Sequence, residues 1–223
     1  MIGCYRIKGK WGENVEKDGN IMLRTGMVLL IPIYVLFLNL ILNDGEVRML
    51  KNIALQIIFI VIILLLSSKD NEFGKIFKVQ KIKIVSFGKY LLYGIVSFVV
   101  GMGLMTMIFS LLKGNVYIYD ESIPKDCFIL FLIEVVVLVP ILEELLYRHI
   151  LCRDIKALTG DGISAIVISA LIFSLLKGSK EMFIVALPLG IVTGFMQNET
   201  DNPHCSMLAH MGFAVAYVFY LVY

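Results

Sequence analysis

The stretch LIEVVVLVPILEELLYRHILCRDIK, residues 132–156, decides the fold. It is typical of a transmembrane helix, yet it carries two adjacent carboxylates, Glu143 and Glu144, with Arg148 close behind. Isolated ionised groups are costly in hydrocarbon, so an acid inside a membrane helix predicts a functional site. Pro140, just before the acidic pair, predicts a kink in this helix.

The spacing of these charges assigns them to different faces of the helix. Glu144 and Arg148 are related as i and i+4, which is the spacing of an ion pair on one face. Glu143 points about 100° away, as successive helical residues do. Arg148 can therefore hold Glu144, while Glu143 is left to act or to find another partner. The alternative, which this stretch alone leaves open, is a helix end whose charges lie at the water interface.

The composition places the whole chain in a membrane. Of its 223 residues, 59% are hydrophobic and 17% are charged, against about 45–50% and 25% in soluble domains. The charges cluster between long apolar runs, as a bilayer requires, because a spanning helix needs about 20 apolar residues. The net charge of +2 and the absence of a basic patch with interleaved aromatics exclude nucleic acid as an expected partner.

Outside residues 132–156, further apolar runs complete the predicted fold. Their lengths favour helices over buried strands, so we predict an all-α, polytopic transmembrane bundle of about seven helices. The expected spans run from about Gly26 to Leu42, Ile53 to Ser67, Val85 to Leu112, Cys127 to Arg148, Gly162 to Leu176, Met182 to Met196 and Ser206 to Tyr223. With no internal repeat, we expect one structural unit, in which residues 1–125 supply a tail and three helices and residues 126–223 supply the core.

Lysine and arginine residues predict the orientation. They gather before the first span, in residues 69–89 and in residues 148–156, whereas the alternate loops hold few. Cytoplasmic loops carry the excess of these residues, so we predict a multi-pass plasma-membrane protein with a cytoplasmic N-terminus. The composition, rich in Ile, Lys and Asn, indicates a bacterial source with an AT-rich genome.

Two more polar residues interrupt later apolar runs. Lys177 follows ISALIFSLL, and His210 lies within CSMLAHMGFAVAYVF. Buried polar groups need partners, and the simplest partners for these two are each other and the carboxylates of the fourth helix. The four cysteines form no CxxC pair, which favours small packed side chains over metal ligands.

These residues resemble the motifs of the CAAX-protease and bacteriocin-processing family, also called the Abi family. Glu143-Glu144-Leu145-Leu146-Tyr147-Arg148 is its EExxxR motif. Phe173 and Lys177 stand where the family has FxxxH, and His210 and Ala214 stand where it has HxxxN. The resemblance covers about residues 126–223 and matches in order, spacing and hydrophobic context.

The resemblance implies intramembrane proteolysis by a glutamate and a histidine, with no covalent acyl-enzyme, and we expect no cofactor. In the family, the glutamate and the second-motif histidine activate a water, and the third-motif histidine and asparagine stabilise the oxyanion. By resemblance, Glu143 would be the base, Glu144 and Arg148 would support it, and His210 would be an oxyanion donor. Family members process prenylated proteins or are linked to bacteriocin immunity and peptide maturation.

Two positions depart from the family pattern. Lys177 replaces the second-motif histidine, and Ala214 replaces the asparagine donor. A lysine acts as a base only when deprotonated, and two nearby carboxylates favour its charged form and would form an ion pair instead. Losing one oxyanion donor costs about 10²–10³ in rate. We therefore expect weak or absent proteolysis.

Other interpretations remain open at this point. Lys177 could snorkel to the interface and leave residual hydrolysis, and Glu143, Glu144 and His210 could bind a metal, although we expect none. The first hypothesis is an impaired endopeptidase acting on a membrane peptide or protein, unmodified rather than prenylated. The second is a non-catalytic relative with a bacteriocin-immunity or regulatory role. A transporter ranks third, because no repeat or paired broken helices are visible.

Overall fold

The computed structural model describes residue 26 and residues 45–68, 84–111 and 127–222. The described residues form helices and short connections, with no strand among them. The all-α prediction is therefore confirmed for this part of the chain. The first expected span, about Gly26 to Leu42, lies almost wholly outside the described residues, as does most of the basic stretch 69–89.

The other six expected helices are present. They are α2 (Gly45–Ser68), α4 (Ile84–Leu111), a long helix from Phe128 to Thr159, α8 (Gly162–Leu175), α9 (Lys180–Thr200) and α10 (Pro203–Val222). Within the described residues, three helices are long and apolar enough to cross a bilayer, namely Ser86–Leu111, Lys180–Thr200 and Pro203–Val222. Leu50–Leu65 and Gly162–Leu175 are shorter apolar helices. The chain is an integral membrane protein.

The long helix is built from five consecutive segments. They are α5 (Phe128–Leu132), the π-helical η2 (Ile133–Leu138), α6 (Val139–Glu144), the π-helical η3 (Leu145–Cys152) and α7 (Arg153–Thr159). Every junction keeps right-handed helical backbone angles, so the helix continues through them. The wider turns of η2 directly precede Pro140, whose ring cannot fit a regular α-helical turn behind it.

The end of this helix corrects one sequence-based boundary. The span expected to stop near Arg148 continues to Thr159, so Arg153 and Lys156 lie on a helix rather than in a loop. Gly160 ends it with a left-handed φ of 71°, a conformation that glycine adopts without steric cost. Asp161 then caps α8, because its carboxylate accepts hydrogen bonds from the backbone N–H groups of Ile163 and Ser164.

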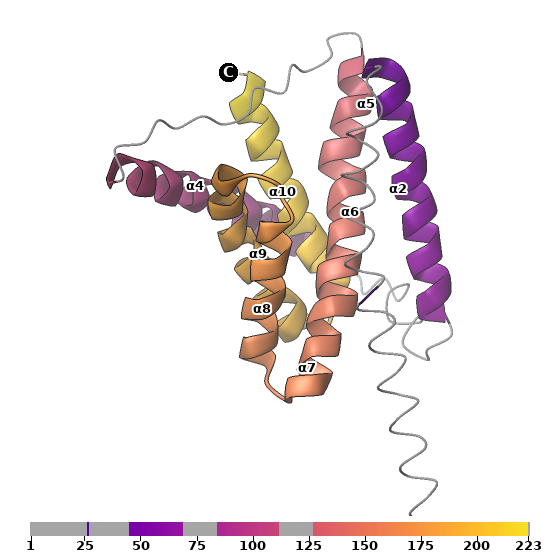
Figure 1. Ribbon diagram of the computed structural model, residues 1–223, viewed down its shortest axis with the longest axis vertical. Helices are drawn as coiled ribbons and strands as arrows, with labels where there is room; N and C mark the ends of the chain where they lie inside the picture. The colour runs from indigo at the N-terminus through magenta and orange to yellow at the C-terminus, as the bar shows by residue number, and fades with distance from the viewer. Residues whose placement is uncertain (1–25, 27–44, 69–83, 112–126, 223) are drawn as a thin grey trace, which may run out of the picture.

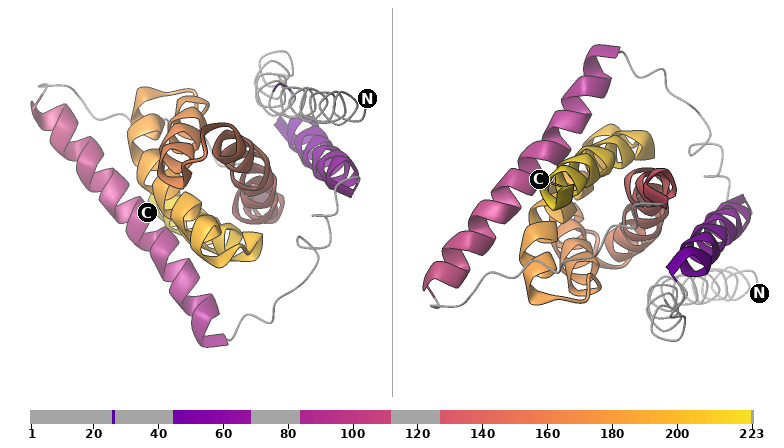
Figure 2. Two further views of the ribbon diagram at one scale, coloured as in Figure 1. Left: turned by 90° about the horizontal axis from the view of Figure 1, so that it is seen from below. Right: turned by 90° about the horizontal axis from the view of Figure 1, so that it is seen from above.

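Helix α4 lies obliquely across α9 and α10, on the side opposite α2 (Figure 2). Two close approaches fix this crossing: a side chain at Gly94 would collide with the backbone of Ala209, and one at Gly212 would collide with that of Leu91. Small residues are the usual means by which membrane helices bring their backbones together. Helix α2 stands beside the long helix, while α8, α9 and α10 pack against its central and lower part (Figure 1).

Candidate active site

The polar residues singled out from the sequence meet in the interior of the bundle. Glu143 and Glu144 end α6, and Arg148 follows one turn later in η3. Lys177 lies in the turn between α8 and α9, and His210 lies in α10. Three parts of the chain that are distant in sequence, the long helix, the turn after α8 and α10, therefore contribute to one cluster.

Glu144 and Arg148 form the inner half of this cluster. Both residues are almost completely buried, at 0% and 1% exposure. The Arg148 Nε atom lies 3.7 Å from Glu144 Oε2 and donates a 2.8 Å hydrogen bond to Thr193 Oγ1. Arg148 Nη1 donates to Ser169 Oγ at 3.4 Å. The guanidinium is thus held by one carboxylate and by hydroxyls from two neighbouring helices.

Glu143 and Lys177 form the outer half. The Lys177 Nζ atom lies 2.7 Å from both Oε1 and Oε2 of Glu143. Their side chains are 21% and 19% exposed, so this ion pair is only partly shielded. Charge-assisted hydrogen bonds of this length are among the stronger ones in proteins. The Lys177 ammonium therefore pairs with the Glu143 carboxylate.

His210 bridges the two halves. Its Nδ1 atom lies 3.0 Å from Glu144 Oε1, and its Nε2 atom lies 3.4 Å from Glu143 Oε2. A neutral imidazole has one N–H and donates to one carboxylate, whereas a protonated ring donates to both. In either state, both ring nitrogens face carboxylate oxygens, so an oxyanion donor role requires one of these contacts to open.

Phe173 packs in the middle of the cluster. It is 1% exposed, and its ring meets the rings of Tyr147 and His210 edge to face. The Arg148 guanidinium carbon lies 5.0 Å from the ring centroid and Lys177 Nζ lies 4.6 Å from it. Both distances are within cation–π range. The ring therefore stabilises both cations and fixes their positions.

Ala214 occupies the position one turn after His210 on α10 and is buried. Its methyl group has no hydrogen to donate. The other two histidines are His149, inside the long helix in η3, and His204, at the start of α10. In the described part of the chain, no group of three or more His, Cys, Asp or Glu side chains is arranged to hold a metal ion.

Thr193 and Ser169 are site residues that the sequence-based reasoning missed. Each is a small hydroxyl residue inside an apolar helix, α9 and α8 respectively, and each is 0% exposed. Such residues commonly hydrogen-bond across membrane helices. A hydroxyl residue inside an apolar helix can be recognised in the sequence. Nothing in the sequence indicates that Thr193 and Ser169 both hydrogen-bond to Arg148.

The cluster therefore unites two adjacent carboxylates, an arginine one turn later and a histidine from the last helix. Residues 125–216 match the family model described as type II CAAX prenyl endopeptidase Rce1-like. The predicted resemblance to the CAAX-protease family is confirmed for this segment. A comparison with curated proteins found no match, and neither did a comparison with solved structures.

Proposed function

We propose that this chain is a membrane endopeptidase of the CAAX-protease type whose hydrolytic chemistry is impaired by the Glu143–Lys177 ion pair. The proposal rests on one observation, the 2.7 Å distance from Lys177 Nζ to each oxygen of the Glu143 carboxylate. A general base must come within hydrogen-bond reach of the water that it activates. Here, a water must displace the ammonium before it can reach Glu143.

The departure from the third motif at Ala214 weakens the proposed hydrolysis as well. Ala214 offers no donor for a developing oxyanion, and both nitrogens of His210 are engaged by carboxylates. The partial exposure of Glu143 still allows water to reach the edge of the site, which supports residual hydrolysis. The proposed substrate is an unmodified membrane peptide or protein, cleaved by attack of a Glu143-activated water in the bacterial plasma membrane.

Restoring the two family residues tests this proposal. Purified wild type, Lys177→His and Lys177→His/Ala214→Asn would be reconstituted in liposomes with two quenched fluorescent probes. One probe is an unmodified transmembrane peptide and the other is a farnesylated peptide with a CAAX end. We expect wild-type turnover barely above that of Glu143→Gln, a rise in Lys177→His, and a further rise of about 10²–10³ in the double variant.

The matched control is Glu143→Gln placed in each of the three backgrounds, and it should abolish turnover in all of them. Robust wild-type turnover that Lys177→His leaves unchanged would contradict the proposed impairment. Folded variants that stay inactive on both probes would contradict the endopeptidase proposal itself.

A second candidate is a non-catalytic relative that binds a membrane peptide, as in bacteriocin immunity. The loss of both motif residues at one site favours it, because Lys177 and Ala214 each remove a catalytic group. Bacteriocin survival of cells that express wild type or Glu143→Gln separates the two functions. A binder retains its protection in the variant, whereas a peptidase loses it.

A further inference from the structure

Tyr147 is a polar residue beside the acidic cluster to which the proposed hydrolysis assigns no role. It lies in η3, one residue before Arg148, and is 3% exposed. Its phenol can donate one hydrogen bond and can also accept. Buried phenols usually have a hydrogen-bond partner within the protein, so the surroundings of this hydroxyl indicate what it can bind.

The Tyr147 hydroxyl makes no hydrogen bond within the described part of the chain. Its oxygen is also not one of the enclosed polar atoms that lack a partner there. The oxygen therefore keeps a small accessible surface. Its proton is available to a molecule that enters the site.

Helical geometry directs the Tyr147 side chain toward Glu143. Tyr147 follows Glu143 by four residues, so the two residues lie on one face of the long helix. Long side chains in helices lean toward the N-terminus and cover the preceding turn. Of the charged groups that act on the Tyr147 hydroxyl, Glu143 has the largest effect, followed by Arg148. The hydroxyl therefore lies near the carboxylate that we propose as the base.

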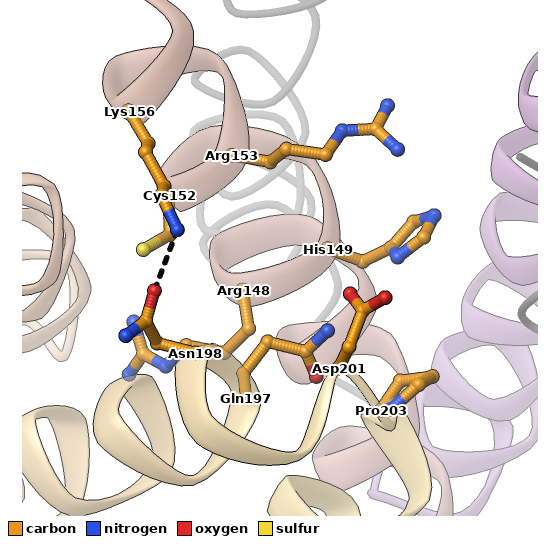
Figure 3. A pocket seen from close by; sticks show the side chains of 9 residues that line it. All are labelled: Arg148, His149, Cys152, Arg153, Lys156, Gln197, Asn198, Asp201 and Pro203. Atoms are coloured by element: carbon orange, nitrogen blue, oxygen red, sulfur yellow. Dashed lines mark hydrogen bonds between the residues drawn. The ribbon is translucent and has the colours of Figure 1, made fainter. Parts of the chain in front are cut away.

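The Tyr147 ring is held by Phe173, in the middle of the cluster. The two ring centroids are 5.3 Å apart in an edge-to-face contact, and Phe173 meets the His210 ring in the same way at 5.8 Å. Elsewhere in η3, His149 and Cys152 line a small pocket near the end of α9 and the start of α10 (Figure 3). Tyr147 does not line that pocket, and its ring packs against the residues of the acidic cluster.

We propose that the Tyr147 hydroxyl donates a hydrogen bond to the scissile carbonyl oxygen, an inference that rests on the proposed endopeptidase function. Glu143 takes a proton from the attacking water, the water oxygen bonds to the carbonyl carbon, and the electron pair of the C=O bond moves onto its oxygen. The phenol donates to this oxyanion and keeps its own proton. As the carbonyl re-forms, the C–N bond breaks and the proton on Glu143 passes to the leaving amine.

The departures from the family pattern give this donor its importance. Ala214 has no hydrogen to donate, and both ring nitrogens of His210 face carboxylate oxygens. The Tyr147 phenol has no acceptor among the described residues, so it can donate to an oxyanion without first breaking another contact. A single oxyanion donor typically contributes about 10²–10³ in rate, which supports residual hydrolysis without the third-motif asparagine.

Tyr147→Phe tests the inference, because it removes the hydroxyl and keeps the ring against Phe173. In the Lys177→His background, with the transmembrane peptide probe, we expect kcat to fall by about 10²–10³. KM should stay unchanged, because the bond strengthens only as the oxyanion forms. Adding Ala214→Asn to these two substitutions should restore part of kcat by supplying another donor. The matched control is Tyr93→Phe, which removes a phenol from a residue of α4 that is 40% exposed and should leave kcat unchanged.

Binding of a phosphinate analogue of the same peptide tests this hydrogen bond in the wild-type chain without turnover. The tetrahedral, anionic phosphinate imitates the oxyanion, so it should bind Tyr147→Phe about tenfold to a hundredfold more weakly than wild type. The parent peptide should bind both proteins equally. Equal phosphinate affinities, or an unchanged kcat in Tyr147→Phe, would overturn the inference and leave the proposed function intact. No phosphinate binding to wild type, together with no turnover in any variant, would overturn the proposed function and this inference with it.

Discussion

Glu143 and Glu144 are neighbours in the sequence and end the same helix, yet they lie in different environments. Glu144 is fully buried, with Arg148 and His210 beside it, whereas Glu143 is about one-fifth exposed and paired with Lys177. Breaking a buried ion pair leaves an uncompensated charge, whereas a more exposed charge is partly compensated by water. We therefore predict that the inner pair contributes more to the stability of the fold, while the outer pair covers the carboxylate that we propose as the base.

The largest effect is expected from Arg148→Met. This change leaves Glu144 buried without its cation and removes the donor to Thr193. We expect the free energy of unfolding to fall by about 3–5 kcal/mol, measured by thermal or denaturant unfolding in detergent micelles. The double variant Arg148→Met/Glu144→Gln should recover part of this loss, and a loss below about 1 kcal/mol would contradict the assignment of a structural role to the inner pair.

Thr193→Val tests the surroundings of the inner pair with a smaller change. It removes the acceptor of Arg148 Nε without altering either charge. Leaving one buried donor unpaired costs about 1–3 kcal/mol, which the same unfolding experiment would detect. Thr106→Val is the matched control, because the Thr106 hydroxyl is exposed and bonds only within its own helix, to the Gly103 carbonyl. Equal effects of the two substitutions would show that the bond to Arg148 contributes nothing.

Lys177→Met tests the outer pair directly. Because Lys177 and Glu143 are each about one-fifth exposed, we expect a cost of about 1–2 kcal/mol, between the values for surface and buried pairs. Lys180→Met, which removes a 77% exposed ammonium, should change stability by less than about 0.5 kcal/mol. If Lys177→Met were as destabilising as Arg148→Met, the claim that the inner pair contributes more stability than the outer pair would be wrong.

The smallest effect concerns a charge outside both pairs, the Asp161 cap of α8. The hydrogen bond from the Ser164 hydroxyl, followed by those from the backbone N–H groups of Ser164 and Ile163, lowers the pKa of Asp161 below its ordinary value of 3.8. Because the folded-state pKa is lowered, the cap contributes its full stability above the ordinary pKa and loses it as the pH falls through the folded-state value.

Thermal unfolding of wild type and Asp161→Asn at pH 7 and at pH 3 measures this contribution. The amide still accepts a hydrogen bond, so the difference between the two proteins should shrink at pH 3, which is below the ordinary pKa of 3.8 that applies to the unfolded chain. A difference that stays constant with pH would exclude the carboxylate charge as its source.

The sequence determined the membrane class, the all-α fold and the family of residues 125–216, because long apolar runs and the EExxxR spacing depend only on local order along the chain. The i,i+4 relation also placed Glu144 beside Arg148, since helical periodicity is a local property. The end of the fourth helix was predicted wrongly: the helix continues past Arg148, because residues 149–152 are themselves buried in the bundle.

Only the tertiary structure decided the partners that come from other helices. The turn after α8 brings Lys177 onto both oxygens of Glu143, α10 sets His210 between the two carboxylates, and α9 supplies Thr193 to Arg148. Sequence spacing cannot give these contacts, because they depend on how separate helices rotate and cross as their small residues pack.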